Sequence, residues 1–398
     1  MVELLVIILH HFGERTMRGI RFVGDALAPS GYGNALRDLA KQFHELGIPF
    51  YFDHIEHDKN RADLCEFWDK HMDKYRQEIP YDIIVNVTTP EFYKFKPDKK
   101  VVAWTFWETT KFPRIEIGGG REGDWVKQMN KLDEFWAPTT FVKDVAIGCG
   151  VETPIQLLPW PCVSKYINIE RPRLDSASIN KAIKDKFVIG SIGQFTERKN
   201  FRDFIMALCS TFNKEEDVIG LIKTYRSNDS SRETNVVRTV LSEWKKSLNI
   251  PDACSFCGVH SILSESQMVA LLDTIDLYVC TSRGEGMSGP LIHAMAMGKP
   301  VISSDFSAMS DFIYGDTSLK VVRYCLEPVH SMSHIPWYGH RQDWARLNVS
   351  DIREGMREGY ELWRDDRDRF EEIGQRGRDF VRKIYSDEAV QKRIKELI

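Results

Sequence analysis

The sequence contains no apolar run long enough for a membrane-spanning helix. Its first candidate, MVELLVIILHH, is far shorter than the ~20 residues that a bilayer crossing needs, and it has neither a basic leader nor a small-residue cleavage site. We expect residues 1–16 to form a buried strand, or an extension outside the main fold, because Met17 begins a second plausible opening. These absences predict a cytoplasmic protein without a transmembrane segment; peripheral association with a membrane stays open.

A strong net charge and a cysteine framework are also missing. The net charge of −4 argues against a protein that binds nucleic acid mainly by electrostatics. The eight cysteines are scattered through apolar surroundings, which indicates reduced, buried thiols rather than disulfides. Cys254 and Cys257 are the only close pair. Without a second pair, we interpret them as part of the core at a strand edge rather than as a zinc site.

An acidic metal-binding loop is missing too. The run Asp365-Asp366-Arg367-Asp368 has suitable carboxylates, but its arginine and its helical setting favour a solvated helix face. The sequence therefore predicts no metal site and no cofactor.

What the sequence does contain is a repeated alternation of strand-like and helical segments. With 398 residues, of which 42% are hydrophobic and 28% charged, it is typical of a soluble globular chain with two domains. The segment after Gly33 has apolar residues at helical spacing and Gly47 as its stop. Such alternation predicts parallel sheets with helices on both faces. The expected strands include GIRFVGDAL, IPFYFDHI, YDIIVNV (81–87), KVVAWTFW (100–107), EFWAPT (134–139), IQLLPWP (155–161), FVIGSIGQF (187–195), VIGLIKTY (218–225), CSFCGV (254–259), DLYVCTS (276–282) and PVISSD (300–305).

A polar stretch divides this alternation into two units. Residues 168–186 have no apolar period and are interpreted as a linker, after which the alternation restarts at Phe187. The charged helical end of the chain belongs to neither sheet, so we expect a terminal helix that crosses back to the first unit. The predicted domains are 1–175 and 176–375, followed by the crossing helix, 376–398.

Three turns that follow strands carry the candidate binding residues. Glu285 lies in the turn SRGEGMSG after DLYVCTS, and Pro290 suits the first turn of a helix whose amino terminus can bind an anion. Arg198 and Lys199 follow the first strand of the second unit, where cations can balance a diphosphate. Gly31-Tyr32-Gly33 is a glycine turn that enters the first helix. In two facing domains these carboxyl-end turns would converge on one cleft.

The second unit resembles a known family. GQFTERKNFRDFIMAL, followed by CGVHSILSESQMVALLDTIDLYVCTSRGEGMSGPLIHAMAMGKPVISSD, is similar to the C-terminal domain of the family 4 (group 1) retaining glycosyltransferases of GT-B fold. The resemblance is strong over 187–312 and looser in the first unit, where SGYGNALRDLAKQFHELG resembles the family's glycine loop and first helix. It implies a GT-B fold, in which two Rossmann-like domains face each other across a cleft, with the acceptor bound on the N-terminal side.

The resemblance also implies a role for individual residues of the second unit. Glu285 would contact the donor sugar and its phosphate, and Lys199 would bind the diphosphate. Val259 falls where the family holds the nucleobase by backbone contacts. The amides that would face the diphosphate or sugar are those of Met287, Ser288 and Gly289.

Three positions depart from the family pattern. Gln194 replaces an arginine, so Arg198 is expected to supply that charge. His293 replaces a glutamate that accepts from the ribose; a neutral imidazole can still accept, or the site is degenerate. The family's histidine in the N-terminal domain has no match, and Glu108 of TFWETTKFP is the candidate there. Glu285 and Glu108 are therefore the candidate catalytic residues, and Gly31, Tyr32 and Gly33 the candidate acceptor or phosphate loop.

The implied activity is metal-independent hexosyl transfer, with retention, from a UDP- or GDP-sugar. The acceptor is left open among a glycan, a lipid-linked sugar, a protein side chain and a small molecule. Two alternatives remain: a non-catalytic nucleotide-sugar-binding protein, favoured by Gln194 and His293, and a sugar-nucleotide epimerase of the same fold. Trp104, Phe106 and Trp107 are interpreted as core more readily than as a sugar platform. The loop 333–347 is a candidate lid or acceptor-side element.

Overall fold

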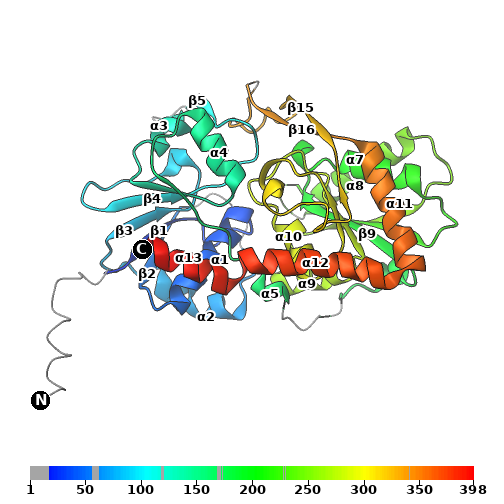
Figure 1. Cartoon of the computed structure of the whole chain (residues 1–398), viewed down its shortest axis with the longest axis horizontal. Coiled ribbons are helices and arrows are strands. Elements are labelled where there is room, and N and C mark those ends of the chain that lie inside the picture. The colour runs from blue at the N-terminus through cyan, green and yellow to red at the C-terminus, as the bar shows by residue number, and fades with distance from the viewer. Residues whose placement is uncertain are drawn as a thin grey trace, which may run out of the picture.

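The computed structural model describes residues 18–55, 62–117, 121–167, 172, 174–226, 228, 230–339 and 341–398, with only the backbone given for 116, 117, 121 and 122. The strand expected within residues 1–16 lies outside this range. Two α/β domains lie side by side, each with its own central sheet, as Figure 1 shows. No helix within the described residues combines the length and the apolar character that a bilayer crossing requires.

The first domain is built on a parallel sheet in the order β2-β1-β3-β4-β7-β8. Its strands are short and almost wholly apolar because helices cover both faces. The strands are β1 (Ile20–Gly24), β2 (Phe50–His54), β3 (Ile83–Asn86), β4 (Lys100–Trp104), β7 (Glu134–Ala137) and β8 (Ile155–Leu157). Between them lie α1 (Gly31–Glu45), α2 (Glu66–Tyr75), η1 (Pro90–Phe92), the hairpin β5 (Arg114–Ile117) and β6 (Arg121–Asp124), α3 (Trp125–Met129) and α4 (Thr140–Cys149).

The second domain contains a parallel sheet in the order β11-β10-β9-β12-β13-β14. Numbered along the domain this is 3-2-1-4-5-6, the doubly wound order in which the chain reverses direction between β9 and β12. The strands are β9 (Phe187–Gln194), β10 (Val218–Tyr225), β11 (Ser255–His260), β12 (Leu277–Val279), β13 (Val301–Ser303) and β14 (Lys320–Val321). The segments between them are η2 (Glu197–Lys199), α7 (Phe201–Thr211), α8 (Ser231–Ser247), α9 (Glu265–Asp273), α10 (Gly289–Ala296) and η3 (Ser307–Asp311).

The stretch predicted as a linker is partly helical. Residues 177–183 form α6 (Ala177–Ile183), none of whose residues is buried. Ser176 caps the helix, because its side chain accepts from the amide of Ile179. Before it comes α5 (Ser164–Ile167), which contacts α10 of the second domain. The absence of an apolar period therefore indicated exposure rather than the absence of a helix.

The end of the chain returns to the first domain along the helices α11 (Val349–Asp365), α12 (Arg367–Tyr385) and α13 (Asp387–Leu397), which Figure 1 draws in orange and red. α12 packs against α10, and α13 packs against α1. Gln391 donates to Gln42 at 2.8 Å, and Arg393 donates to Gln156 at 2.7 Å. Residue 376, the predicted start of the crossing segment, lies inside α12, so the exact domain boundaries stay predictions.

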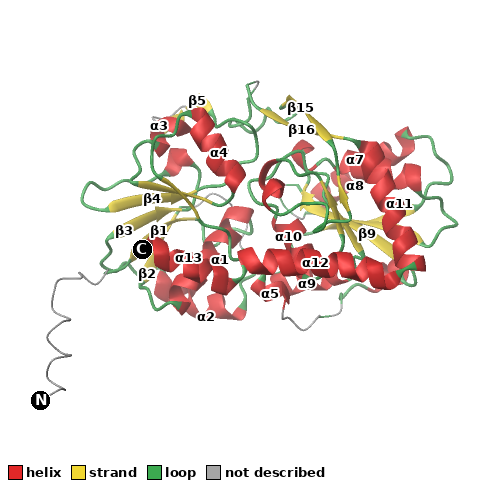
Figure 2. Ribbon diagram, in the orientation of Figure 1, coloured by secondary structure: helices red, strands yellow, loops and turns green. Residues whose placement is uncertain are grey.

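A hairpin projects from the second domain toward the first, as Figure 2 shows. Its strands are β15 (Tyr324–Pro328) and β16 (Asp343–Leu347), paired antiparallel. The loop between them contains most of the segment predicted as an aromatic, polar loop. We refer to residues 324–347 as the arm.

Candidate functional site

The candidate site lies where the chain reverses direction in the second sheet. Arg198 and Lys199 lie in η2, just beyond the carboxyl end of β9, and Glu285 lies in the loop between β12 and α10. β9 and β12 are neighbours in the sheet, so the two loops emerge side by side. Crevices at this position are the usual ligand sites of doubly wound sheets.

Glu285 forms a buried ionic cluster with both cations. Its carboxylate lies 2.5 Å from the Lys199 ammonium and 2.9 Å from the Arg198 guanidinium, and the residue is only 4% exposed. Its backbone is also fixed, because its amide donates to the hydroxyl of Ser307 at 2.8 Å and its carbonyl accepts from Ala308 at 3.1 Å. Two cations from one loop thus hold a single carboxylate from the other.

The charges of this cluster are mutually stabilised. Burial alone would raise the pKa of Glu285, but the nearby Arg198 and Lys199 outweigh it and lower the pKa to about 2. Burial alone would lower the pKa of Arg198, yet Glu285 and Glu108 raise it well above its usual value. Glu285 and Arg198 are therefore both ionised at neutral pH.

The first domain contributes Glu108 to the same cluster. This residue follows β4, and its carboxylate lies 3.2 Å from Nε of Arg198. The two loops are in close contact: a Cβ atom on Gly284 would lie 2.1 Å from the carbonyl oxygen of Glu108, and one on Gly286 would lie 2.6 Å from the amide of Trp107. Glycine at these positions is what allows the loops of the two domains to pack backbone to backbone.

The glycine turn of the first domain approaches the same loop through Tyr32. Its hydroxyl donates to the carbonyl of Phe106 at 3.1 Å and lies 3.0 Å from the amide of Phe106, which donates to it. Gly33 packs tightly, since an added Cβ would lie 2.2 Å from the carbonyl of Ala28, whereas Gly31 has open space around its Cα. Ser30 caps α1 by accepting from the amide of Gly33.

The helix α10 begins at Gly289, shortly after Glu285, and is deeply buried. Met287 is 8% exposed and Ser288 is 2% exposed. Gly289, the first residue of the helix, faces the indole of Trp160, which would lie 3.2 Å from an added Cβ atom. The first turn of the helix therefore adjoins both the ionic cluster and an aromatic residue of the first domain.

His293 lies one helical turn further on and stacks against Tyr166, with 3.9 Å between the ring centroids and 17° between the planes. The pKa of His293 lies well below its usual value, mainly because the ring is buried and also because Lys165 is positively charged. The ring is therefore neutral. Its Nε2 atom is buried and has no hydrogen-bond partner among the described residues. A neutral imidazole with an unpartnered nitrogen can accept a hydrogen bond from a ligand hydroxyl or donate one, depending on its tautomer.

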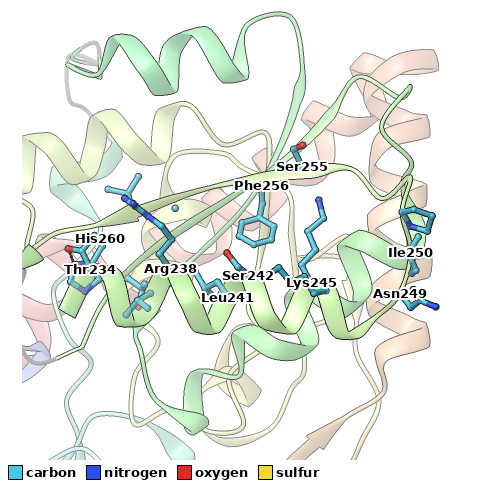
Figure 3. A pocket seen from close by; sticks show the side chains of 16 residues that line it. Thr234, Arg238, Leu241, Ser242, Lys245, Asn249, Ile250, Ser255, Phe256 and His260 are labelled. Atoms are coloured by element: carbon cyan, nitrogen blue, oxygen red, sulfur yellow. Dashed lines mark hydrogen bonds between the residues drawn. The ribbon is translucent and has the colours of Figure 1, made fainter. Parts of the chain in front are cut away.

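Two predicted binding residues are not part of the cluster. Gln194 is exposed at the end of β9, and its amide donates to the carbonyl of Arg226 at 2.9 Å. Val259 lies in β11, the edge strand, and lines a cavity of about 680 Å³ between β11 and α8. Figure 3 shows this cavity, with Thr234 and His260 at one end and Asn249 and Ile250 at the other.

Several contacting residues were not predicted from the sequence. Tyr338, in the arm, donates its hydroxyl to Glu108 and stacks on Trp107 with 5.6 Å between the centroids. Burial and the charge of Glu108 raise the pKa of Tyr338 well above its usual value. Tyr166 and Ser307 were also missed. The only sequence signal was the aromatic character of the segment 333–347, because none of these residues belongs to a motif.

The aromatic residues after β4 are largely core, as expected. Trp104 is fully buried and Trp107 is 4% exposed. Phe106 is half-buried against Tyr32. Cys254 is likewise buried, and no group of three or more potential metal ligands occurs among the described residues. In the acidic run, Asp365 pairs with Arg364 on the surface and Asp366 caps α12 by accepting from the amide of Arg369.

Comparison with known proteins defines the class to which the fold belongs. A family model for glycosyl transferases group 1 matches residues 186–324, which span the second sheet from β9 to β14. No curated protein matches the chain by sequence.

Solved structures match over nearly the whole chain. One is Alr3699/HepE from Anabaena in complex with UDP and glucose, with a TM-score of 0.61, 13% identity and coverage of 96% of this chain and 99% of that chain. Another is sucrose-phosphate synthase from Thermosynechococcus elongatus, with a TM-score of 0.62, 14% identity and coverage of 96% and 98%. A third is the pneumococcal O-GlcNAc transferase GtfA in complex with UDP and GlcNAc, with a TM-score of 0.59, 9% identity and coverage of 98% and 99%. The predicted GT-B fold is thereby confirmed.

Proposed function

We propose that the chain is a retaining glycosyltransferase that moves a hexosyl group from a nucleoside diphosphate sugar to an acceptor, without a metal or cofactor. One observation carries the proposal. Arg198, Lys199 and Glu285 form a buried ionic cluster at the switch point of the second sheet, inside the segment that the glycosyl transferase family model matches. Two cations and a helix amino terminus at one crevice suit a diphosphate, and the carboxylate suits sugar hydroxyls.

In this proposal the protein supplies charge and position rather than a nucleophile. Arg198, Lys199 and the amides at the start of α10 stabilise the negative charge that develops on the leaving diphosphate. The acceptor oxygen attacks the anomeric carbon from the side that the diphosphate leaves, and the departing phosphate oxygen takes the acceptor proton. Glu285 and Glu108 orient the sugar between the domains, where proximity supplies much of the rate.

The contacts of the cluster indicate how the donor would be received. Glu285 neutralises both cations, at 2.5 Å from Lys199 and 2.9 Å from Arg198. A diphosphate would compete with that carboxylate for Lys199 and Arg198. Once the diphosphate is bound, the carboxylate would be available to the hydroxyl groups of the sugar, and His293 would be available to the ribose.

The donor is proposed to be a UDP- or GDP-sugar. Two structures of similar fold contain UDP together with glucose or with GlcNAc, which makes UDP-sugars the first candidates. The cavity beside Val259 is proposed to receive the nucleobase end. The acceptor is a glycan, a lipid-linked sugar, a protein side chain or a small molecule, and the proposed location is the cytoplasm or the cytoplasmic surface of a membrane.

A second candidate is a protein that binds nucleotide sugars without turnover. Two observations favour it. Gln194 is uncharged and its amide is hydrogen-bonded to the Arg226 carbonyl, and the ring of Tyr166 covers one face of His293. An epimerase of the same fold would instead convert the donor with no acceptor present.

A ligand screen followed by a turnover assay separates these functions. UDP-, GDP- and ADP-sugars are tested by thermal shift, since a bound ligand at a hundredfold excess over its Kd stabilises the fold by about 2.7 kcal/mol. Donor hydrolysis and transfer are then measured with the ligands that bind. Binding with turnover supports the transferase, binding alone supports the second candidate, and a changed sugar without an acceptor indicates an epimerase.

The variant Glu285→Gln sharpens this assay. We expect transfer to be abolished while nucleotide affinity stays within a few-fold, because the amide keeps the shape and loses the charge. Glu243→Gln is a matched control, since Glu243 pairs with Lys246 on the exposed surface of α8. Unchanged transfer in Glu285→Gln would contradict the role assigned to this residue.

A further inference from the structure

The two strands of the arm are attached to both loops that carry the ionic cluster. Arg283, two residues before Glu285, lies 2.5 Å from Glu327 of β15 and 3.1 Å from Glu197 of η2. The guanidinium also lies over the ring of Trp344 in β16, 5.5 Å from its centroid. Arg283 is 8% exposed, and its contacts with Glu327 and Glu197 are partly buried. They connect the arm to the loops of Arg198 and Glu285.

Next to this attachment, at the first residue of β16, the arm contacts the loop of the first domain that contains Glu108. Thr110 exchanges two hydrogen bonds with Asp343: its amide donates to the Asp343 carbonyl at 3.1 Å, and its hydroxyl accepts from the Asp343 amide at 2.9 Å. Trp337 and Tyr338 pack against the core of the first domain. One element of the second domain thus reaches the loop of the first domain that lies against the site.

Tyr338 connects this contact to the charges. Its ring stacks on Trp107 while its hydroxyl donates to the Glu108 carboxylate, whose same oxygen lies 3.2 Å from Arg198. Arg198 in turn donates to the Gly284 carbonyl at 2.8 Å and pairs with Glu285. A continuous series of polar contacts therefore runs from the arm to Glu285.

We propose that Tyr338 is a positioning residue for the transfer reaction: its hydroxyl holds the Glu108 carboxylate against Arg198 when the two domains are closed. This inference rests on the proposed function and extends it to a segment beyond the family-model match, which ends at residue 324. Without the hydroxyl, Glu108 retains one partner and can rotate away from the crevice. The nucleotide would be bound by residues of the second domain. Removal of the hydroxyl should therefore lower the rate of sugar transfer, the step that needs both domains, rather than the affinity for the nucleotide.

The test compares two tyrosines of the same arm. Tyr338→Phe keeps the stacked ring and removes the hydroxyl. Tyr324→Phe is the control, because Tyr324 is 39% exposed and its hydroxyl makes no hydrogen bond in the described structure. We expect Tyr338→Phe to lower kcat for transfer roughly tenfold, the scale of one hydrogen bond to a charged group, with the affinity for the nucleoside diphosphate within twofold of wild type. Tyr324→Phe should match wild type.

A double-mutant cycle distinguishes positioning from a general structural role. If Tyr338 acts through Glu108, then adding Tyr338→Phe to Glu108→Gln should cause a much smaller further loss in kcat than it causes alone. If the hydroxyl only stabilises the arm, the two losses multiply. Multiplying losses, or a Tyr338→Phe enzyme with wild-type kcat, would overturn the proposal.

Hydrogen–deuterium exchange gives a readout that does not depend on turnover. Tyr338→Phe should increase amide exchange in residues 105–110 of the first domain, whereas Tyr324→Phe should not. Unchanged exchange in 105–110 overturns the positioning role. Increased exchange in a protein that turns over no donor would support the contact and contradict the proposed transferase instead.

Discussion

Lys199 contacts one carboxylate of the cluster, that of Glu285, whereas Arg198 contacts those of both Glu285 and Glu108. The Lys199 ammonium lies 2.5 Å from Glu285, and its side chain crosses Gly193, where an added Cβ would lie 2.9 Å from Cδ of Lys199. The glycine leaves room for the lysine to lie along the end of β9 and reach the crevice. The position of this ammonium is therefore set by strand and loop together.

We predict that Lys199→Ala weakens binding of a nucleoside diphosphate far more than binding of the bare nucleoside. The variant removes a charge-assisted contact worth roughly 1.5–3 kcal/mol. Titration calorimetry with UDP and uridine, and with GDP and guanosine, measures the difference. Lys214→Ala is the control, because Lys214 is a largely exposed lysine of the same domain. Equal losses for nucleotide and nucleoside would show that Lys199 does not contact the diphosphate.

The burial of His293 can be tested without a ligand, through the pH dependence of the protein's stability. Its pKa is lowered well below the ordinary value of 6.5, so the unfolded chain binds a proton that the folded chain does not. Stability is therefore lost as pH falls below about 6.5, with a slope of up to about 1.4 kcal/mol per pH unit. Lys165, which also lowers the pKa, stays charged throughout this range.

The variant His293→Phe should remove this pH dependence while keeping an aromatic ring against Tyr166. We expect wild type to lose roughly 1 kcal/mol relative to the variant between pH 7.5 and pH 5.5. Urea unfolding at three pH values measures it, and other histidines cancel in the comparison. Parallel pH profiles for the two proteins would mean that folding does not lower the pKa of His293.

For the secondary-structure elements, the sequence predicted the structure correctly where it depends on a single strand or a single turn. Continuous apolar runs such as FVIGSIGQF predicted buried parallel strands, and β9 spans residues 187–194 of that run. The turn with Glu285 was placed correctly after a strand and before a helix. The role of each residue in the turn stays a prediction.

The sequence predicted residues 333–347 as a loop that is a candidate lid or acceptor-side element. It did not predict the hairpin of the arm, because the conformation of the hairpin depends on the other domain. None of the five residues of β15 is buried. Its sequence therefore has no strong alternation of apolar and polar residues. Tyr338 finds its partners 230 residues away in the chain. Only the relative placement of the domains brings those residues together, and no local pattern encodes that placement.

The crossing helix α13 offers a prediction about how the two domains are joined. Val390 and Ile394 are fully buried, although the helix lies far in sequence from the α1 helix that it contacts. Ile394→Ala should lower the free energy of unfolding by about 2–4 kcal/mol, the usual effect of such a truncation in a core. Chemical denaturation measures it, with the exposed Lys395→Ala as the control. A loss below about 0.5 kcal/mol, the range of surface substitutions, would mean that α13 is not docked.

For the molecule as a whole, the described conformation is a closed one. The loop that contains Glu285 lies directly against the loop after β4, and Met287 and Ser288, which precede α10, are less than a tenth exposed. We therefore expect these loops to separate before a donor reaches Lys199. Opening and closing of the two domains is therefore part of the proposed cycle.

Gly286 is the position at which this closure can be blocked with one methyl group. The three atoms nearest to an added Cβ all belong to the first domain: the Trp107 amide nitrogen at 2.6 Å, and Phe106 Cβ and carbonyl carbon at 2.8 and 3.1 Å. We predict that Gly286→Ala lowers kcat for transfer at least tenfold, because the domains can no longer meet, while nucleotide affinity changes less than twofold. Small-angle scattering should show a larger radius of gyration for the variant than for wild type. Gly315→Ala is the control, since nothing lies within 4 Å of its added Cβ. A variant that scatters like wild type and transfers normally would mean that the closed packing of these loops is not needed for the reaction.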